Sequence, residues 1–134
     1  MISQVKAKTI KGNSQDEIQS ALNESLVDGF KPTLAIVFIS IKQDRDAICS
    51  LLNNESIIIF GSTTSGEFIS SEMSEGGIVV MLLDMNPALF RVLFLETADS
   101  SVFEISKQVG AEGKKAFSNP AFIIASGWLH TDGE

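Results

Sequence analysis

The 134-residue sequence contains very few of the residues that most often build redox, metal or base-stacking sites. It has one cysteine, one histidine, one tryptophan and no tyrosine. A single cysteine cannot form an internal disulfide or a cysteine-rich zinc site, and its scarcity fits a reducing compartment. The lone histidine, His130, has no Cys or Met at a helpful spacing, so we interpret it as a solvated side chain. The sequence predicts neither a metal ion nor a cofactor.

Basic residues are also scarce: ten Lys and Arg stand against seventeen Asp and Glu, for a formal net charge of -7. A negative field of this kind repels nucleic-acid phosphates and anionic lipid headgroups, so we expect no nucleic acid and no membrane as partners. No stretch approaches the ~20 apolar residues of a membrane span, and the first eight residues lack the apolar run of a signal peptide. We therefore predict a cytoplasmic location.

The residues that are abundant are those of an ordinary globular protein. Hydrophobic residues make up 44% of the chain and charged residues 20%, and a chain of this length can bury one core. We predict one α/β domain over residues 1–134. Because the pattern stops after a strand, where a helix would normally follow, we expect this domain to be incomplete at its C-terminus.

Apolar runs and capping residues predict the order of strands and helices. The runs predict strands at residues 4–10, 34–39, 56–60, 78–85, 89–96 and 121–125. Helices are predicted to begin at Ser14, at Asp44 and near Ser100, with Gly29 ending the first. The strand, helix and strand over 34–60 predict a parallel crossover, and the short connection at 86–88 predicts an antiparallel hairpin. The predicted fold is therefore a mixed β-sheet with helices packed on its faces, in which the strands at 34–39 and 56–60 are buried on both faces.

The most informative segment is the polar, glycine-bracketed stretch Gly61–Glu67, which we interpret as a loop after a buried parallel strand. Open α/β sheets bind ligands at such strand ends. Hydroxyl groups and free amides can bind a small polar molecule there, and Glu67 adds a carboxylate for an ammonium or hydroxyl group. The candidate ligand-binding residues are Gly61, Ser62, Thr63, Thr64, Ser65, Gly66 and Glu67, with Ser40 and Ser126, at the ends of neighbouring strands, as second-rank candidates. A plain turn whose side chains bond their own backbone remains an equal alternative.

Two catalytic motifs fail at this segment. The spacing of Gly61 and Gly66 imitates a phosphate-binding loop, but Glu67 stands where the lysine should be and Phe68 where the magnesium-binding hydroxyl should be. A nucleophile elbow around Ser65 would need glycine at the position of Thr63. We therefore predict that the protein is not an enzyme.

The segment Ile58–Glu67 resembles the strand and G-[CS]-[ST]-T-x-G-E signature of the FIST sensory domains. Leu34–Ser40 is similar to that family's hydrophobic strand ending in a small residue, and Gly77–Met81 is similar to its next strand. The resemblance implies an amino-terminal FIST domain of a bacterial signal transduction protein. It further implies small ligands such as amino acids, and a C-terminal FIST partner domain or signalling output domain.

These expectations combine into a predicted function: a small-ligand-binding sensory domain, with an amino acid or related metabolite as its ligand. Two alternatives stay open. One is a haem-binding, gas-sensing variant of the same family, and the other is a protein–protein interaction module without a ligand. Because an incomplete domain can leave a sheet edge exposed, a homodimer is also among the expected assemblies.

Overall fold

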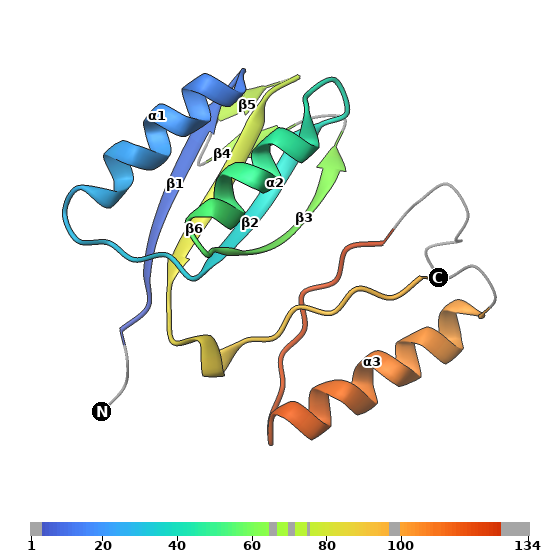
Figure 1. Cartoon of the computed structure of the whole chain (residues 1–134). Helices are drawn as coiled ribbons and strands as arrows, with labels where there is room; N and C mark the ends of the chain where they lie inside the picture. Colours follow the sequence, from blue (N-terminus) through green and yellow to red (C-terminus); the bar gives the residue numbers. More distant parts are fainter. Residues whose placement is uncertain (1–3, 65–66, 70–71, 75, 97–99, 127–134) are drawn as a thin grey trace. The chain divides into compact units, whose positions relative to one another are not determined.

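The computed structural model describes residues 4–64, 67–69, 72–74, 76–96 and 100–126 (Figure 1). Contacts divide the chain into unit 1, residues 1–90, and unit 2, residues 91–134, and each is described by itself. Unit 1 is a mixed α/β structure, as predicted, and unit 2 has one helix among its described residues.

Unit 1 contains a four-stranded sheet in the order β1-β6-β2-β3. Its strands are β1 (Lys6–Gly12), β6 (Ile78–Asp84), β2 (Leu34–Ser40) and β3 (Ile58–Thr64). The pairing of β2 with β3 is parallel, and β6 is antiparallel to both β1 and β2. The strands β4 (Glu67–Ile69) and β5 (Glu72–Ser74) form a separate antiparallel pair. The predicted mixed sheet and parallel crossover are confirmed.

The two helices of unit 1 begin where their capping residues predict. In α1 (Gln15–Leu26), Ser14 Oγ accepts the Glu17 N–H (3.2 Å), and Glu17 Oε2 accepts the Asn13 N–H (2.7 Å). In α2 (Arg45–Asn54), Asp44 Oδ1 accepts the Ala47 N–H (3.0 Å). Each cap satisfies amides that lack an intrahelical partner. After α1, Gly29 adopts a left-handed φ of 82° and turns the chain toward β2.

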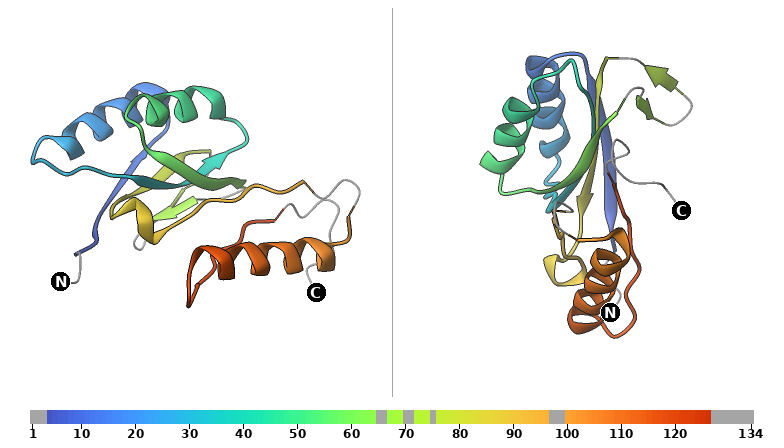
Figure 2. Two further views of the ribbon diagram at one scale, coloured as in Figure 1. Left: turned by 60° about the horizontal axis from the view of Figure 1, so that its bottom comes forward. Right: turned by 90° about the vertical axis from the view of Figure 1, so that its right-hand side faces the viewer.

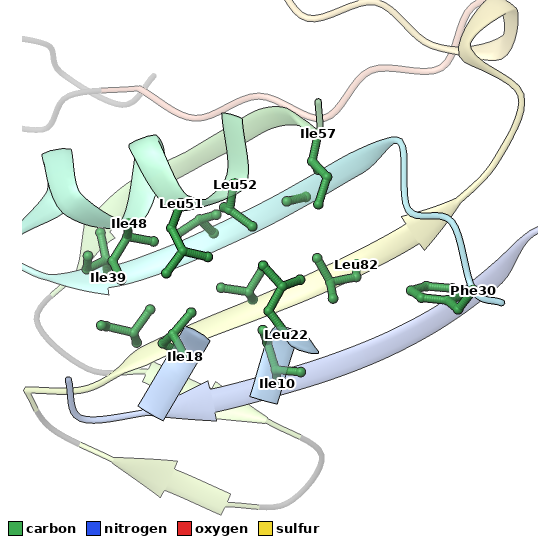
Figure 3. Close-up of a cluster of buried hydrophobic side chains, with 14 residues drawn as sticks. Ile10, Ile18, Leu22, Phe30, Ile39, Ile48, Leu51, Leu52, Ile57 and Leu82 are labelled. Carbon is green, nitrogen blue, oxygen red and sulfur yellow. The ribbon is translucent and has the colours of Figure 1, made fainter. Parts of the chain in front are cut away.

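Both helices cover the same face of the sheet, and the core lies between the two layers (Figures 2 and 3). Alternate residues of β2 and β6 point into it, with Ala35, Val80 and Leu82 fully buried. Ile18 and Leu22 of α1 and Ile48 and Leu52 of α2 fill the space above them.

The opposite face of the sheet, which we call the helix-free face, is formed by the other residues of the same strands. They are Leu34, Ile36, Phe38 and Ser40 of β2, Ile58, Phe60, Ser62 and Thr64 of β3, and Val79, Met81 and Leu83 of β6. Phe38 is 41% exposed, Met81 42% and Ile58 46%. The prediction that both β2 and β3 are buried on both faces is therefore wrong. A continuous apolar run shows that both faces are apolar, but not that both are covered.

The predicted hairpin of residues 78–85 with 89–96 is also wrong. Residues 78–84 form β6, but Pro87–Leu89 form a 3-10 helix, η1, and residues 90–96 have no regular structure. The physical reason is that β6 lies between β1 and β2, so both of its edges are already hydrogen-bonded. The chain turns away at η1, where Asn86 Oδ1 accepts the Ala88 N–H (3.0 Å). The antiparallel hairpin of the structure is instead β4–β5.

Unit 2 contains the predicted third helix, α3 (Val102–Ala116), which begins at the Ser101 cap. Phe122 packs on it so closely that a Cβ at Gly113 would lie 2.4 Å from the Phe122 ring. The strand predicted at 121–125 is absent from the described structure, where these residues have no regular secondary structure. Within unit 2 no described strand offers them a partner, and an apolar run alone does not make a strand.

An ion pair joins β1 to the turn that follows α1 and gives a pH-dependent prediction. Lys8 Nζ lies 2.7 Å from Asp28 Oδ2, and a hydrogen bond from Lys8, then one from the Phe30 N–H, lower the pKa of Asp28 below its ordinary 3.8. A lowered pKa means that the unfolded chain binds this proton more readily, so the stabilisation is present above the ordinary value and is lost as pH falls through the lowered pKa. Asp28→Asn should therefore lose less stability in acid than the wild type, as measured by urea unfolding at neutral and acid pH. Equal losses in both proteins would contradict this role for Asp28.

Candidate functional site

The carboxyl ends of β2 and β3 lie side by side and bring several predicted residues together. Ser40, the last residue of β2, is in register with Thr64, the last residue of β3. Phe38 is likewise in register with Ser62. Because residues in register share a face, Ser40, Ser62 and Thr64 all belong to the helix-free face. Ser40 therefore lies beside residues 61–64, as predicted, whereas Ser126, also predicted to end a neighbouring strand, follows no strand in the described structure.

Ser40 is 4% exposed, and hydrogen bonds hold it in place. Its N–H donates to Gly77 O (3.0 Å), and its carbonyl accepts the Gln43 N–H (3.0 Å). Its side-chain oxygen accepts the Lys42 N–H at 3.3 Å. Ser40 is therefore held in place at this end of the sheet, because its carbonyl and its side-chain oxygen both bond the loop that leads to α2.

Gln43 connects two loops at the same end of the sheet. Its Nε2 donates to Asn13 O (2.9 Å), between β1 and α1, and to Gly76 O (2.7 Å), just before β6. Gly76 has a left-handed φ of 82°, which glycine adopts without strain. Sequence reasoning missed Gln43, because both acceptors are backbone carbonyls of residues remote along the chain, and the sequence carries no signal for such contacts.

Residues 61–64 continue strand β3, so the prediction of a loop beginning at Gly61 is wrong. The prediction was that glycine lets the backbone approach a ligand closely. The structure gives another reason for Gly61: a Cβ there would lie 2.1 Å from Val37 O. Glycine is thus required at this position, because the backbone of β2 leaves no room for a side chain there. The composition of residues 61–64 predicted a loop because Gly, Ser and Thr usually mark turns. Here pairing with β2 holds these residues in an edge strand instead.

The hydroxyl side chains of β3 differ in exposure. Thr63 is exposed, whereas Ser62 and Thr64 are half-buried. The Ser62 hydroxyl donates to Thr63 O at 2.8 Å. This is the local bonding that the plain-turn alternative anticipated, although it leaves the lone pairs of the Ser62 oxygen able to accept a further hydrogen bond.

The structure describes the remaining predicted residues to different extents. Ser65 and Gly66 lie outside the described residues. Glu67 is the first residue of β4, but its side chain is outside the description. Ser126 is exposed, in unit 2, and follows a segment without regular structure. Their roles in ligand binding stay predictions.

Two hollows among the described residues lie elsewhere, between β1 and α1. They are shallow, with volumes of about 510 and 400 Å³, and Lys11, Ala21 and Glu24 line both. Lys8, at the larger hollow, is already bound to Asp28 and to Ser25 O. The described residues include no group of three or more His, Cys, Asp or Glu side chains placed to hold a metal ion. None of the described helices is long and apolar enough to cross a membrane.

Comparison with known proteins identifies the family of this chain. The family model of the FIST N domain matches residues 33–134, which include β2, β3, the β4–β5 hairpin and β6. Searches of curated proteins and of solved structures found no significant match. FIST domains are sensory domains of signal transduction proteins and are not an enzymatic family. Because the match spans more than half of the chain and includes the strands that carry Ser40 and Thr64, this protein belongs to the FIST N domain family.

Proposed function

We propose that this protein senses a small polar molecule, an amino acid or a related metabolite, at the carboxyl ends of β2 and β3. The observation that carries the proposal is the register of Ser40 with Thr64 beside loops tied together by Gln43. Strand ends of this kind are where open α/β sheets place their ligands. Here they place Ser40, which hydrogen bonds hold, beside the hydroxyl side chains of β3.

The chemistry of the site suits a ligand that has both hydrogen-bonding and cationic groups. The Ser62 oxygen, on the helix-free face, can accept a hydrogen bond, and Thr64 shares that face. Glu67, three residues after the end of β3, supplies a carboxylate for an ammonium group. A free amino acid carries such an ammonium group next to polar oxygens, so it matches these partners in one small molecule.

The β4–β5 hairpin gives the site a way to signal. It begins at Glu67 and leads to Gly76, whose carbonyl Gln43 holds. A ligand bound to Glu67 would favour one placement of the hairpin over others, because binding shifts a conformational equilibrium toward the state that it contacts better. In a bacterial cytoplasmic protein, the following FIST or output domain would respond to that shift.

Thermal-shift titration of the whole chain with individual amino acids tests the proposal, because a ligand that binds the native state raises the melting temperature. We expect at least one amino acid to raise it. Glu67→Gln should raise the dissociation constant of that amino acid by about tenfold or more, since hydrogen bonds to charged groups contribute about 1.5–3 kcal/mol.

Glu72→Gln is the matched control, because Glu72 begins the other strand of the same hairpin and removing its charge changes the net charge equally. This control should bind as the wild type does. If no amino acid shifts the melting temperature, or if Glu67→Gln binds as tightly as Glu72→Gln, recognition through Glu67 is refuted.

A further inference from the structure

The two edges of the four-stranded sheet differ in charge. β1, at one edge, carries Lys6, Lys8 and Lys11. β3, at the other edge, is seven residues long and contains no charged residue and no proline. Lysine and proline on an edge strand prevent it from pairing with other strands, and an uncharged edge without them is open to pairing. Within the described part of unit 1, the β1 edge therefore carries residues that oppose pairing with another strand, and the β3 edge carries none.

The backbone of β3 can be assigned a bonded side and a free side. The Ile58 N–H donates to Thr33 O (2.9 Å), next to β2. Because successive residues of a strand direct their amides to opposite sides, the amides of Ile59, Gly61 and Thr63 face away from β2. In the described part of the sheet, β2 is the single neighbour of β3. These three residues thus offer a row of donors and acceptors to an added strand.

We propose that β3 pairs antiparallel with β3 of a second copy of this chain, around a twofold axis at Gly61. Residues 58–64 are symmetric about residue 61, so the whole strand pairs with itself. Gly61 then faces Gly61 of the second copy, and Ile59 faces Thr63. Both are pairs of outward-facing residues, which is the arrangement that exchanges two hydrogen bonds in an antiparallel ladder.

Electrostatics favours a second copy at this edge over other contacts between copies. The chain carries a net charge of -7, so copies repel each other over most of their surface. β3 places no charge in the contact. In the paired sheet both outer edges are β1, whose lysines oppose further addition, and the assembly closes at two copies.

Pairing also changes the surroundings of the site. On the helix-free face, Ile58 and Phe60 of one copy lie opposite Thr64 and Ser62 of the other, within the distance at which cross-strand side chains interact. Thr64 of the second copy would thus partly bury Ile58, which is 46% exposed in the single chain. The hydroxyls at each strand end therefore gain apolar neighbours from the second copy. The pairing itself does not depend on whether a ligand binds.

Sedimentation velocity of the whole chain over a wide range of concentration, without added amino acid, tests the pairing. We expect a species of twice the 14.4 kDa chain mass. Thr63→Pro removes an outward-facing amide from each copy without removing a bond to β2, and proline is tolerated on the free side of an edge strand. Loss of these two hydrogen bonds should weaken the dimer by about tenfold or more.

Thr63→Val keeps the amide and should dimerise as the wild type does, whereas Thr63→Lys adds a charge to the edge and should be monomeric even if the proline variant fails to fold. In a mixed-label dimer, interchain Hα contacts between Phe60 and Ser62 should identify the register. A wild type that stays monomeric overturns the proposal, as do a Thr63→Lys variant that dimerises normally and interchain contacts in another register. Amino-acid binding can fail while the dimer forms, so the two proposals are tested separately.

Discussion

Leu52→Ala is expected to lower the free energy of unfolding by about 2–5 kcal/mol. Leu52 is 0% exposed and lies on the face of α2 that meets the sheet (Figure 3). Truncation removes its transfer free energy and leaves a cavity that the other residues of the core cluster can fill only in part. Urea unfolding followed by circular dichroism measures the change.

Ile41→Ala provides the matched control, because Ile41 is also a branched aliphatic residue but is 77% exposed. An exposed substitution of this kind is expected to change stability by less than about 0.5 kcal/mol. If the two variants unfold at the same urea concentration, the core between the sheet and the two helices is not packed as described.

Gly61→Ala is expected to destabilise the protein by about 3 kcal/mol, at the upper end of the cost of overpacking. The added Cβ would lie 2.1 Å from Val37 O and 2.9 Å from Val37 C. Backbone atoms inside a sheet cannot rotate away as the end of a side chain can, so β2 and β3 must separate. The same unfolding measurement should show the loss.

Gly110→Ala makes the same chemical change in α3, where the added Cβ meets no atom within 4 Å. There the substitution should stabilise the helix by about 0.5–1 kcal/mol, because alanine loses less backbone entropy than glycine. Opposite signs for the two variants are therefore expected. A Gly61→Ala protein as stable as the wild type would refute the close approach of β3 to β2.

The signature glycine illustrates how a correct family assignment can accompany a wrong local interpretation. The resemblance over Ile58–Glu67 is confirmed by the family match. The loop predicted from Gly61 onward is an edge strand, and Gly61 is needed for contact with Val37. Composition shows that a glycine is present, but only the partner strand shows which atom excludes a side chain.

Strand pairing limited the other predictions in the same way. Residues 89–96 are as apolar as a strand requires, yet β6 has no free edge to offer them. Ser40 could be placed beside Thr64 from the parallel crossover alone, because two parallel strands joined by a helix end at the same edge of a sheet. Gln43 could not be placed, because its partners come from two other connections.

The sequence by itself determined the helix starts at Ser14 and Asp44, the alternation of β1 and the apolar character of β2, β3 and β6. These features depend on groups within about four residues of each other, so local spacing is sufficient to predict them. Only the tertiary structure decided the strand order, which faces are covered and which edge stays open. Those depend on β6 inserting between β1 and β2, a choice made by contacts between residues far apart along the chain.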